Sequence, residues 1–148
     1  MDYRSYDTRL AAYAVVVDDR GQILLALWNE GPEPRWTMPG GGVELEETPQ
    51  QATVRELREE TGYDVRLGPL LTVHTEVERA RPDGSARPHK SVRVVFEAEV
   101  VGGELTAEVG GTTDEARWFP LAEVPDLRRS PIVDVAVTAW LEGRPAGR

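Results

Sequence analysis

The chain contains no cysteine, and methionine, phenylalanine and histidine occur only 2 times each among its 148 residues. The absence of cysteine excludes a disulfide framework and a thiolate metal site, and it is compatible with the cytoplasmic location that we expect. No apolar run is long enough to cross a bilayer, and the N-terminus lacks the charged-then-apolar pattern of a signal peptide. We therefore expect a protein with no membrane partner.

Basic residues are scarce as well, with 17 Lys and Arg against 26 Asp and Glu, a net charge of −9. A chain this acidic is not expected to hold duplex nucleic acid by counterion release, and it repels free polyphosphate at long range. A phosphate substrate would have to arrive as a metal complex or meet locally placed arginines. The length and the 40% apolar content predict a single domain, residues 1–148, with a core of its own.

The most informative stretch begins with three glycines at 40–42, followed by an acidic turn and a predicted helix. Thr48 is a typical N-cap residue, Pro49 suits the first helical position, and Gln51 stands where a capping-box partner belongs. Good helix formers follow, and Gly62 supplies a stop signal. The sequence therefore predicts a helix that begins at about Pro49 and ends just before Gly62.

Three acids on this helix, Glu56, Glu59 and Glu60, are spaced so that their carboxylates share one helical face. Unpaired, they repel one another, whereas a hard divalent cation such as Mg²⁺ binds such oxygens together with substrate phosphates. Composition alone leaves a second interpretation open. Arg55 and Arg58 can pair with neighbouring acids, and the face is then an ordinary solvated surface.

The run from Gly41 to Tyr63 resembles the Nudix box, the motif of the Nudix hydrolase family, at every fixed position but one. The motif specifies nine positions in 23 residues, and the last is usually aliphatic, where this chain has the bulky and mostly apolar Tyr63. The positions that match are Gly41, Glu47, Arg55, Glu56, Leu57, Glu59, Glu60 and Gly62.

The resemblance implies roles for these residues. Glu56, Glu59 and Glu60 correspond to metal ligands for Mg²⁺, with Mn²⁺ as an alternative, and Glu59 is also assigned to the catalytic set. Glu47 corresponds to a residue that supports or joins the metal shell, and Arg55 to the arginine that orients the acids, although an ordinary salt bridge would look much the same. The resemblance also implies that a backbone carbonyl of Gly41, or of Gly40 next to it, binds the metal. Glycine permits such close backbone approach, and a tight turn is the alternative explanation.

The general base is expected outside the box, where the first candidate is Glu115. Asp114, Glu108 and a box glutamate are the alternatives. Of the two histidines, His74 is expected to be structural, and His89 lies in a basic loop that is expected to be solvated. The base is therefore assigned to Glu115 as a prediction.

Substrate contacts are expected from Trp36 and Arg35, because both lie beside the glycine segment. The other tryptophans, Trp28, Trp118 and Trp140, are expected in the core.

The remaining pattern predicts several strands and a second helix. Strands are expected at 10–17, 22–28, 63–67, 70–78, 91–101 and 116–119, and a helix at 130–141 capped by Ser130. The first two strands are expected to form a hairpin. Together with the resemblance, this order predicts an α/β fold, the Nudix α/β/α sandwich with a mixed β-sheet, over a core of about 10–142.

Members of this family cleave the diphosphate linkage of a nucleoside diphosphate joined to another group, by attack of water on phosphorus. The resemblance thus implies a small-molecule substrate of this kind, such as a nucleoside triphosphate or a nucleotide sugar, and allows a homodimer. An ADP-ribose or dinucleotide pyrophosphatase is an alternative, although Glu78 stands where the ADP-ribose type tends to have proline, and Arg79 where the dinucleotide type tends to have tyrosine. A catalytically silent nucleotide-binding sensor is a third hypothesis, which predicts a degraded box.

Overall fold

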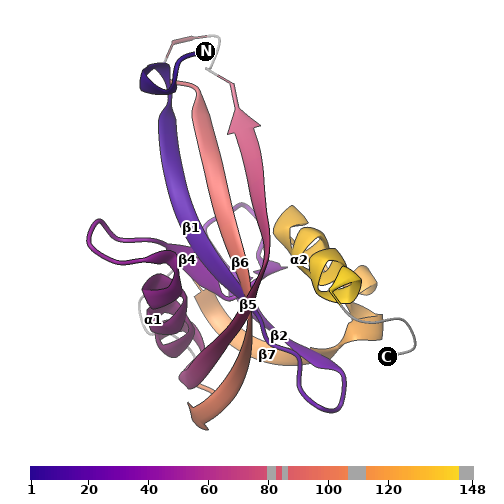
Figure 1. The fold of residues 1–148 in the computed structure, drawn as a ribbon. Coiled ribbons are helices and arrows are strands. Elements are labelled where there is room, and N and C mark those ends of the chain that lie inside the picture. Colours follow the sequence, from indigo (N-terminus) through magenta and orange to yellow (C-terminus); the bar gives the residue numbers. More distant parts are fainter. Residues whose placement is uncertain (80–82, 85–86, 107–112, 144–148) are drawn as a thin grey trace.

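The computed structural model describes residues 1–79, 83–84, 87–106 and 113–143, with only the backbone of residues 113 and 114. Two sheets lie between the helices α1 and α2 (Figure 1). The elements are η1 (Tyr3–Ser5), β1 (Asp7–Val15), β2 (Gln22–Trp28), β3 (Arg35–Thr37), β4 (Gly40–Gly42), α1 (Pro49–Thr61), β5 (Tyr63–Glu78), β6 (His89–Gly103), β7 (Thr113–Pro120), η2 (Leu121–Asp126) and α2 (Pro131–Glu142).

The first sheet has the strand order β4-β1-β6-β5, and the second has the order β3-β2-β7. Strand β1 runs parallel to β6, and the other pairs are antiparallel. The predicted α/β class with a mixed sheet between helices is therefore confirmed. None of the helices in the described part of the chain has the length and apolar character needed to span a bilayer.

The predicted hairpin of the first two strands is wrong. β1 and β2 belong to different sheets, and their pairing is confined to the turn, where an isolated antiparallel bridge joins Val17 to Ile23 and backbone hydrogen bonds join Asp18 to Gln22 and Leu24 to Val16. The turn after β1 carries the chain from one sheet to the other, because residues 11–16 are buried on both faces and need partners on each side. The strand also begins earlier than predicted, at Asp7 rather than Leu10, because Asp7 already pairs with His89 of β6.

The predicted break at Gly68 and Pro69 does not end the strand. β5 runs without interruption from Tyr63 to Glu78, and its register with β6 shifts between Leu67 and Leu70. β5 is an edge strand, so a proline and a bulge are accommodated there without loss of an interior ladder. The prediction of two separate strands was wrong for this reason.

Two apolar clusters hold the layers together. One contains Leu57 of α1 with Leu24 of β2 and Ala14 of β1. The other joins β1 and β6 to Ile132 and Val133 of α2. Ser130 stands at the N-cap of α2 as predicted, but its side chain makes no capping hydrogen bond.

Candidate active site

The limits of α1 are set by its caps, as the sequence predicts. The Thr48 side chain accepts from the backbone N–H of Gln51, and the Gln51 side chain accepts from the N–H of Thr48. Pro49 occupies the first turn, and Gly62 ends the helix in the left-handed conformation with φ 79°. The helix is therefore fixed at both ends, which fixes the side chains that it carries.

The apolar side of α1 is narrow. Leu57 is fully buried in the core, whereas Val54 is 39% exposed. On the buried side of the helix, the hydroxyl of Thr53 donates a hydrogen bond to the carbonyl oxygen of Pro49. The remaining faces of the helix are left to charged residues.

Strand β4 places a glycine backbone directly against the helix. Gly40 pairs with Tyr13 of β1 and has φ +146°, and a Cβ there would lie 2.2 Å from the carbonyl oxygen of Ala12. Its N–H donates to Oε2 of Glu60 at 3.0 Å, and Glu60 is only 4% exposed. The Glu60 carboxylate is thus held at the junction between α1 and β4.

Gly41 meets the next carboxylate in the same way. A Cβ built on Gly41 would lie 2.7 Å from Oε1 of Glu56, so only glycine leaves room for this carboxylate beside the backbone. The predicted pair of a glycine backbone and the acids of α1 is therefore brought together in space.

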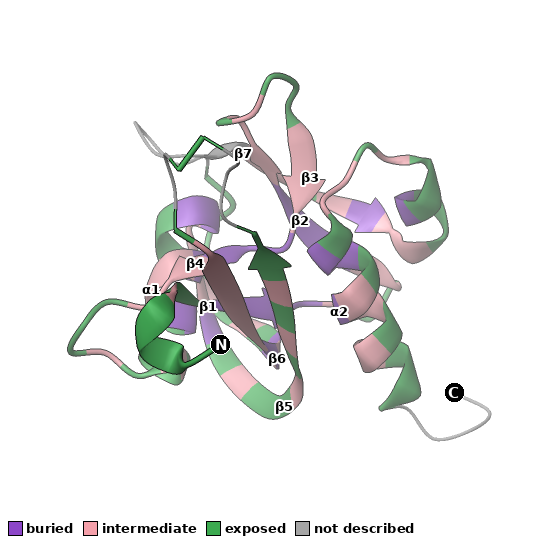
Figure 2. Ribbon diagram, turned by 90° about the horizontal axis from the view of Figure 1, so that it is seen from above, coloured by how far each residue is buried: buried purple, intermediate pink, exposed green. Residues whose placement is uncertain are grey.

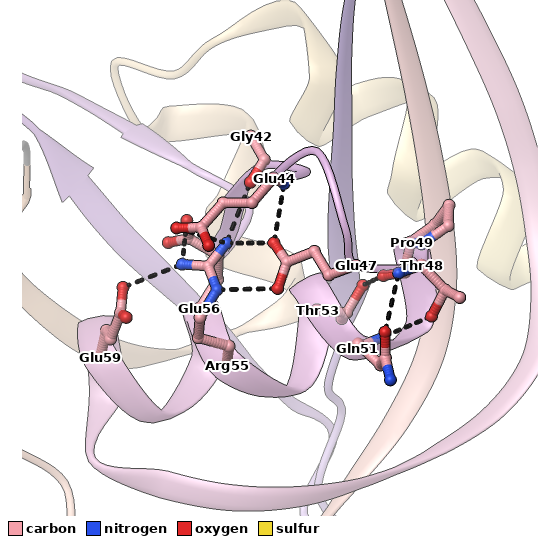
Figure 3. Close-up of polar contacts among 10 residues, drawn as sticks. All are labelled: Gly42, Glu44, Glu47, Thr48, Pro49, Gln51, Thr53, Arg55, Glu56 and Glu59. Atoms are coloured by element: carbon pink, nitrogen blue, oxygen red, sulfur yellow. Dashed lines mark hydrogen bonds and ion pairs between the residues drawn. The ribbon is translucent and has the colours of Figure 1, made fainter.

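Arg55 lies among the carboxylates, and Figure 3 shows its guanidinium between them. Its Nε and Nη2 donate to the two oxygens of Glu47 at 3.0 and 2.5 Å. Nη1 donates to Glu56 at 3.1 Å and to Glu59 at 3.2 Å, and Nη2 also donates to the carbonyl oxygen of Gly42 at 3.1 Å. Nη2 also lies 4.0 Å from Oε1 of Glu44, so one cation contacts four acids and the glycine strand.

These contacts set the ionisation of the pair. The hydrogen bond from Arg55, followed by the one from the Glu44 N–H, lowers the pKa of Glu47. The same hydrogen bond to Glu47 raises the pKa of Arg55. Glu47 is therefore an ionised acceptor that holds Arg55 in place over the other acids. Arg58, the other arginine considered as a partner for the acids, pairs instead with Asp64 at 3.1 Å.

Among the described residues, no three Asp, Glu or His side chains already converge on a point that could hold a cation. The donor set is nevertheless all oxygen: the Glu56 and Glu60 carboxylates lie against the backbone of Gly41 and Gly40. Hard divalent cations take such oxygens. The residues present fit such a cation, provided that Glu56 and Glu59 exchange their contacts with Arg55 for it.

Glu115 lies apart from these acids. It is paired with Arg117, whose Nη2 donates to both of its carboxylate oxygens at 3.1 and 3.0 Å. Arg117 also lies over the rings of Trp36, at 5.4 Å, and Phe119, at 5.7 Å. The alternate residues of β7, such as Trp118, pack toward α1 instead. No described contact joins Glu115 to the carboxylates of α1.

Trp36 and Arg35 lie on β3, just before the glycine strand. The Trp36 ring packs edge-on against Phe119 at 4.7 Å, and its backbone N–H donates to the carbonyl of Arg128. The Arg35 guanidinium lies over the Trp28 ring at 5.9 Å. In the described part of the chain, its buried Nε has no hydrogen-bond partner. A buried donor of this kind favours an added acceptor.

Two alternatives for the general base and the predicted core tryptophans remain to be placed in the structure. Glu108 lies outside the described residues, as does the side chain of Asp114. Of the tryptophans predicted in the core, Trp118 and Trp140 are half-buried and pack against the two apolar clusters, and Trp28 is half-buried outside them.

Two contacts of the site were not predicted from the sequence: the pairing of Arg117 with Glu115, and the hydrogen bond from Arg55 to the carbonyl oxygen of Gly42. The spacing of Glu115 and Arg117 on one strand face is a signal that could have identified Arg117. Nothing in the sequence indicates the Gly42 acceptor, because it depends on where β4 meets α1.

Replacing Gly41 with alanine is expected to lower kcat at least about tenfold while leaving the fold intact, because the new methyl group displaces the end of the flexible Glu56 side chain. Gly40→Ala is the matched comparison. There the methyl group meets backbone at a positive φ, so unfolding free energy is expected to fall by about 2–4 kcal/mol. Steady-state kinetics and urea denaturation of both variants measure the two effects. If the two variants lost kcat and unfolding free energy to the same extent, the separate roles given to Gly41 and Gly40 would be wrong.

Comparison with known proteins places these features in a family. The chain is 36% identical over 126 residues to an ADP-ribose pyrophosphatase of Methanocaldococcus jannaschii, covering 84% of this chain and 70% of that protein. A NUDIX hydrolase from Nitrosomonas europaea has a similar fold, with a TM-score of 0.76 at 22% identity over 93% of this chain and 90% of that one. A MutT NUDIX hydrolase from Burkholderia pseudomallei gives a TM-score of 0.70 at 26% identity, over 93% and 99%.

The resemblance in the glycine and glutamate segment extends over nearly the whole sequence, since the family model of the NUDIX domain matches residues 7–141. The predicted fold is confirmed by the solved structures that share it. The chain therefore belongs to the Nudix hydrolases, enzymes that act on phosphoric anhydrides.

Proposed function

We propose that this enzyme hydrolyses the diphosphate linkage of a nucleoside diphosphate joined to another group, in a reaction that depends on Mg²⁺ or, as an alternative, Mn²⁺. The observation that carries this proposal is the meeting of Glu56 and Glu60 with the backbone of Gly41 and Gly40. The buried carboxylate of Glu60 and the partly buried carboxylate of Glu56, beside the glycine backbone, form a donor set suited to a hard cation and a pyrophosphate.

The protein residues have separate tasks in this proposal. Glu56, Glu59 and Glu60, with the carbonyl of Gly41, would hold the cation. Bound Mg²⁺ would neutralise charge on phosphate oxygens and lower the pKa of a bound water molecule. Arg55, fixed by Glu47, holds the acids in position and limits their repulsion.

Binding of the nucleotide is assigned to β3 and its neighbours. The partly buried Trp36 ring and the unpartnered Nε of Arg35 offer an aromatic surface and a cation on the strand that leads into β4. These groups would compensate locally for the net charge of −9, which repels a free polyphosphate. We keep Glu115 as the proposed general base. This assignment requires that its carboxylate release Arg117 and accept a hydrogen bond from a water molecule instead.

ADP-ribose is the first substrate to test, because the relative from Methanocaldococcus jannaschii is named for that activity. Hydrolysis would place water oxygen on one phosphorus and release AMP and ribose 5-phosphate. Residue 78 is glutamate rather than the proline typical of the ADP-ribose type, which weighs against an enzyme specific for ADP-ribose. The panel of substrates to be tested therefore also includes nucleoside triphosphates, nucleotide sugars and dinucleoside polyphosphates.

The prediction is that the purified chain with Mg²⁺ hydrolyses ADP-ribose with a kcat/KM of at least about 10⁴ M⁻¹s⁻¹, and that EDTA abolishes the reaction. Separation of products by chromatography, in water enriched with ¹⁸O, identifies the phosphorus that is attacked. A tenfold preference for nucleoside triphosphates would replace ADP-ribose with that class. Nucleotide binding without turnover of any member of the panel would contradict the proposed reaction and favour the sensor hypothesis.

A further inference from the structure

Strand β4 forms one edge of the first sheet and separates two kinds of charged side chain. Successive residues of a strand point to opposite faces, so Gly41 and Gly42 are turned to different sides of the sheet. A Cβ on Gly41 would lie 2.7 Å from Oε1 of Glu56, whereas a Cβ on Gly42 would lie 3.5 Å from Nη2 of Arg9. The edge therefore has a carboxylate on one face and a guanidinium on the other, with no side chain of its own between them.

Arg9 belongs to the face of the first sheet that is turned toward α2. Ala11 follows it by two positions on β1 and is buried in the apolar cluster that contains Ile132 of α2. Trp36, to which we assigned nucleotide binding, packs against the same cluster. Arg9 and the Trp36 ring therefore lie on the same side of the first sheet.

A second arginine on this face, Arg93 of β6, is already paired. It forms an ion pair with Glu76 of β5 at 2.8 Å, and its side chain is only 20% exposed. Exposed and half-buried residues alternate along β5 (Figure 2), and the half-buried residues His74 and Glu76 lie on the same face as Arg93. Arg9 is exposed instead, and its guanidinium forms no ion pair within the part of the chain that the structure describes. Arg9 is therefore a cation that a ligand can reach.

The distance between Arg9 and the acids of α1 suits two linked phosphates. Consecutive Cα atoms are about 3.8 Å apart, so the Glu56 carboxylate and the Arg9 guanidinium lie within roughly 13 Å of each other across β4. A diphosphate with a bound cation bridges a gap of this size, with one phosphate on each side of the bare edge. Guanidinium groups form strong, charge-assisted hydrogen bonds with phosphate. On a chain with a net charge of −9, such a cation offsets the repulsion of a free polyphosphate.

We propose that Arg9 is a substrate-binding residue, whose guanidinium donates hydrogen bonds to one phosphate while the other phosphate lies at the acids of α1. The identity of the ligand, a nucleoside diphosphate derivative, rests on the proposed function. Hydrolysis leaves a single phosphate on each product, and neither product can then span β4. Arg9 therefore favours substrate over product, and it selects ligands with two linked phosphates over nucleoside monophosphates.

The test measures affinity without turnover. Isothermal titration calorimetry with Mg²⁺ and α,β-methylene-ADP, whose carbon bridge resists hydrolysis, should give a dissociation constant at least about tenfold higher for Arg9→Met than for wild type. Arg9→Lys keeps the charge but not the planar fork, so its dissociation constant should lie between the two. Wild type should bind the analogue at least about tenfold more tightly than AMP, and Arg9→Met should lose most of this preference.

Arg66→Met is the matched control, because Arg66 is also an exposed arginine of the first sheet but pairs with Glu99, on strands that do not contact β4. Its dissociation constant should stay within about twofold of wild type, and thermal melts check that every variant is folded. In steady-state assays with ADP-ribose, Arg9→Met should raise KM at least about tenfold and leave kcat within about threefold, as expected when a contact made equally in the ground and transition states is lost.

Unchanged affinity of Arg9→Met, an equal loss in Arg66→Met, or a wild type that does not bind the analogue at about 1 mM would overturn this inference. Turnover with an unchanged KM in Arg9→Met would refute the role of Arg9 and leave the proposed hydrolysis intact. Binding that depends on Arg9 without turnover of any substrate would refute the hydrolysis and leave the role of Arg9 intact.

Discussion

Glu60→Gln is expected to reduce kcat at least about 100-fold in the presence of Mg²⁺. Glutamine has nearly the same shape, and its amide oxygen can still accept from the N–H of Gly40, so the contact between α1 and β4 is preserved. The substitution removes the negative charge that a divalent cation requires. A rate assay with saturating substrate, together with a thermal melt, separates lost chemistry from lost folding.

Glu46→Gln is the matched control for this substitution. Glu46 lies in the acidic turn that precedes α1 and is exposed, and its neutralisation should leave kcat within about twofold of wild type. Full activity of the Glu60→Gln protein would show that this carboxylate does not bind the metal. The assignment of the cation to the junction of α1 and β4 would then have to be abandoned.

Arg55→Met is expected to lower the free energy of unfolding by about 2–3 kcal/mol at neutral pH and kcat about 10- to 100-fold. Methionine keeps much of the aliphatic stem but removes the guanidinium that contacts Glu47, Glu56 and Glu59. Three carboxylates are then left close together without their cation. Urea denaturation measures the first effect, and kinetics at saturating metal measure the second.

Acid should reduce the difference in stability between wild type and Arg55→Met. The pKa of Glu47 is lower in the folded chain than its ordinary value of 4.5. Its pairing with Arg55 therefore stabilises the fold fully above pH 4.5 and is lost as the pH falls toward the folded value. The arginine stays protonated throughout.

Arg58→Met serves as the control on the same helix. The Arg58 side chain is 72% exposed, and within the part of the chain that the structure describes it forms an ion pair only with Asp64. Its loss is expected to change stability by less than about 0.5 kcal/mol. Comparable losses for both arginines would indicate a general effect of helix charge rather than the specific cluster around Arg55.

Local signals in the sequence predicted α1 well, because its ends depend on short-range chemistry. The exchange of hydrogen bonds between Thr48 and Gln51, and the left-handed Gly62, need no information from distant residues. Strand partners could not be predicted in this way. The burial of residues 11–16 indicates a central strand, but only the tertiary fold decides that β1 pairs with β6 rather than with β2.

The same limit applies to the candidate site. The spacing of the glutamates on α1 was sufficient to expect them together, but their approach to Gly40 and Gly41 depends on how β4 packs against the helix. The position of Glu115 depends on the pairing of β7 with β2, which turns it to the face that holds Trp36. The sequence alone predicts which side chains share one face of a helix. It does not predict which side of a sheet a strand residue occupies when that strand pairs with residues far away in the sequence.

The parallel pairing of β1 with β6 has a consequence for biosynthesis. Asp7 pairs with His89, and Val15 with Glu97, so the two strands at the centre of the first sheet are separated by 82 positions in the chain (89 − 7 and 97 − 15). A ribosome that releases the chain from its N-terminus makes α1 well before β6 is available. The acidic helix can therefore form on the nascent chain before β6 has been synthesised and can pair with β1. Pairing of β1 with β6 is expected to be the rate-limiting step of folding.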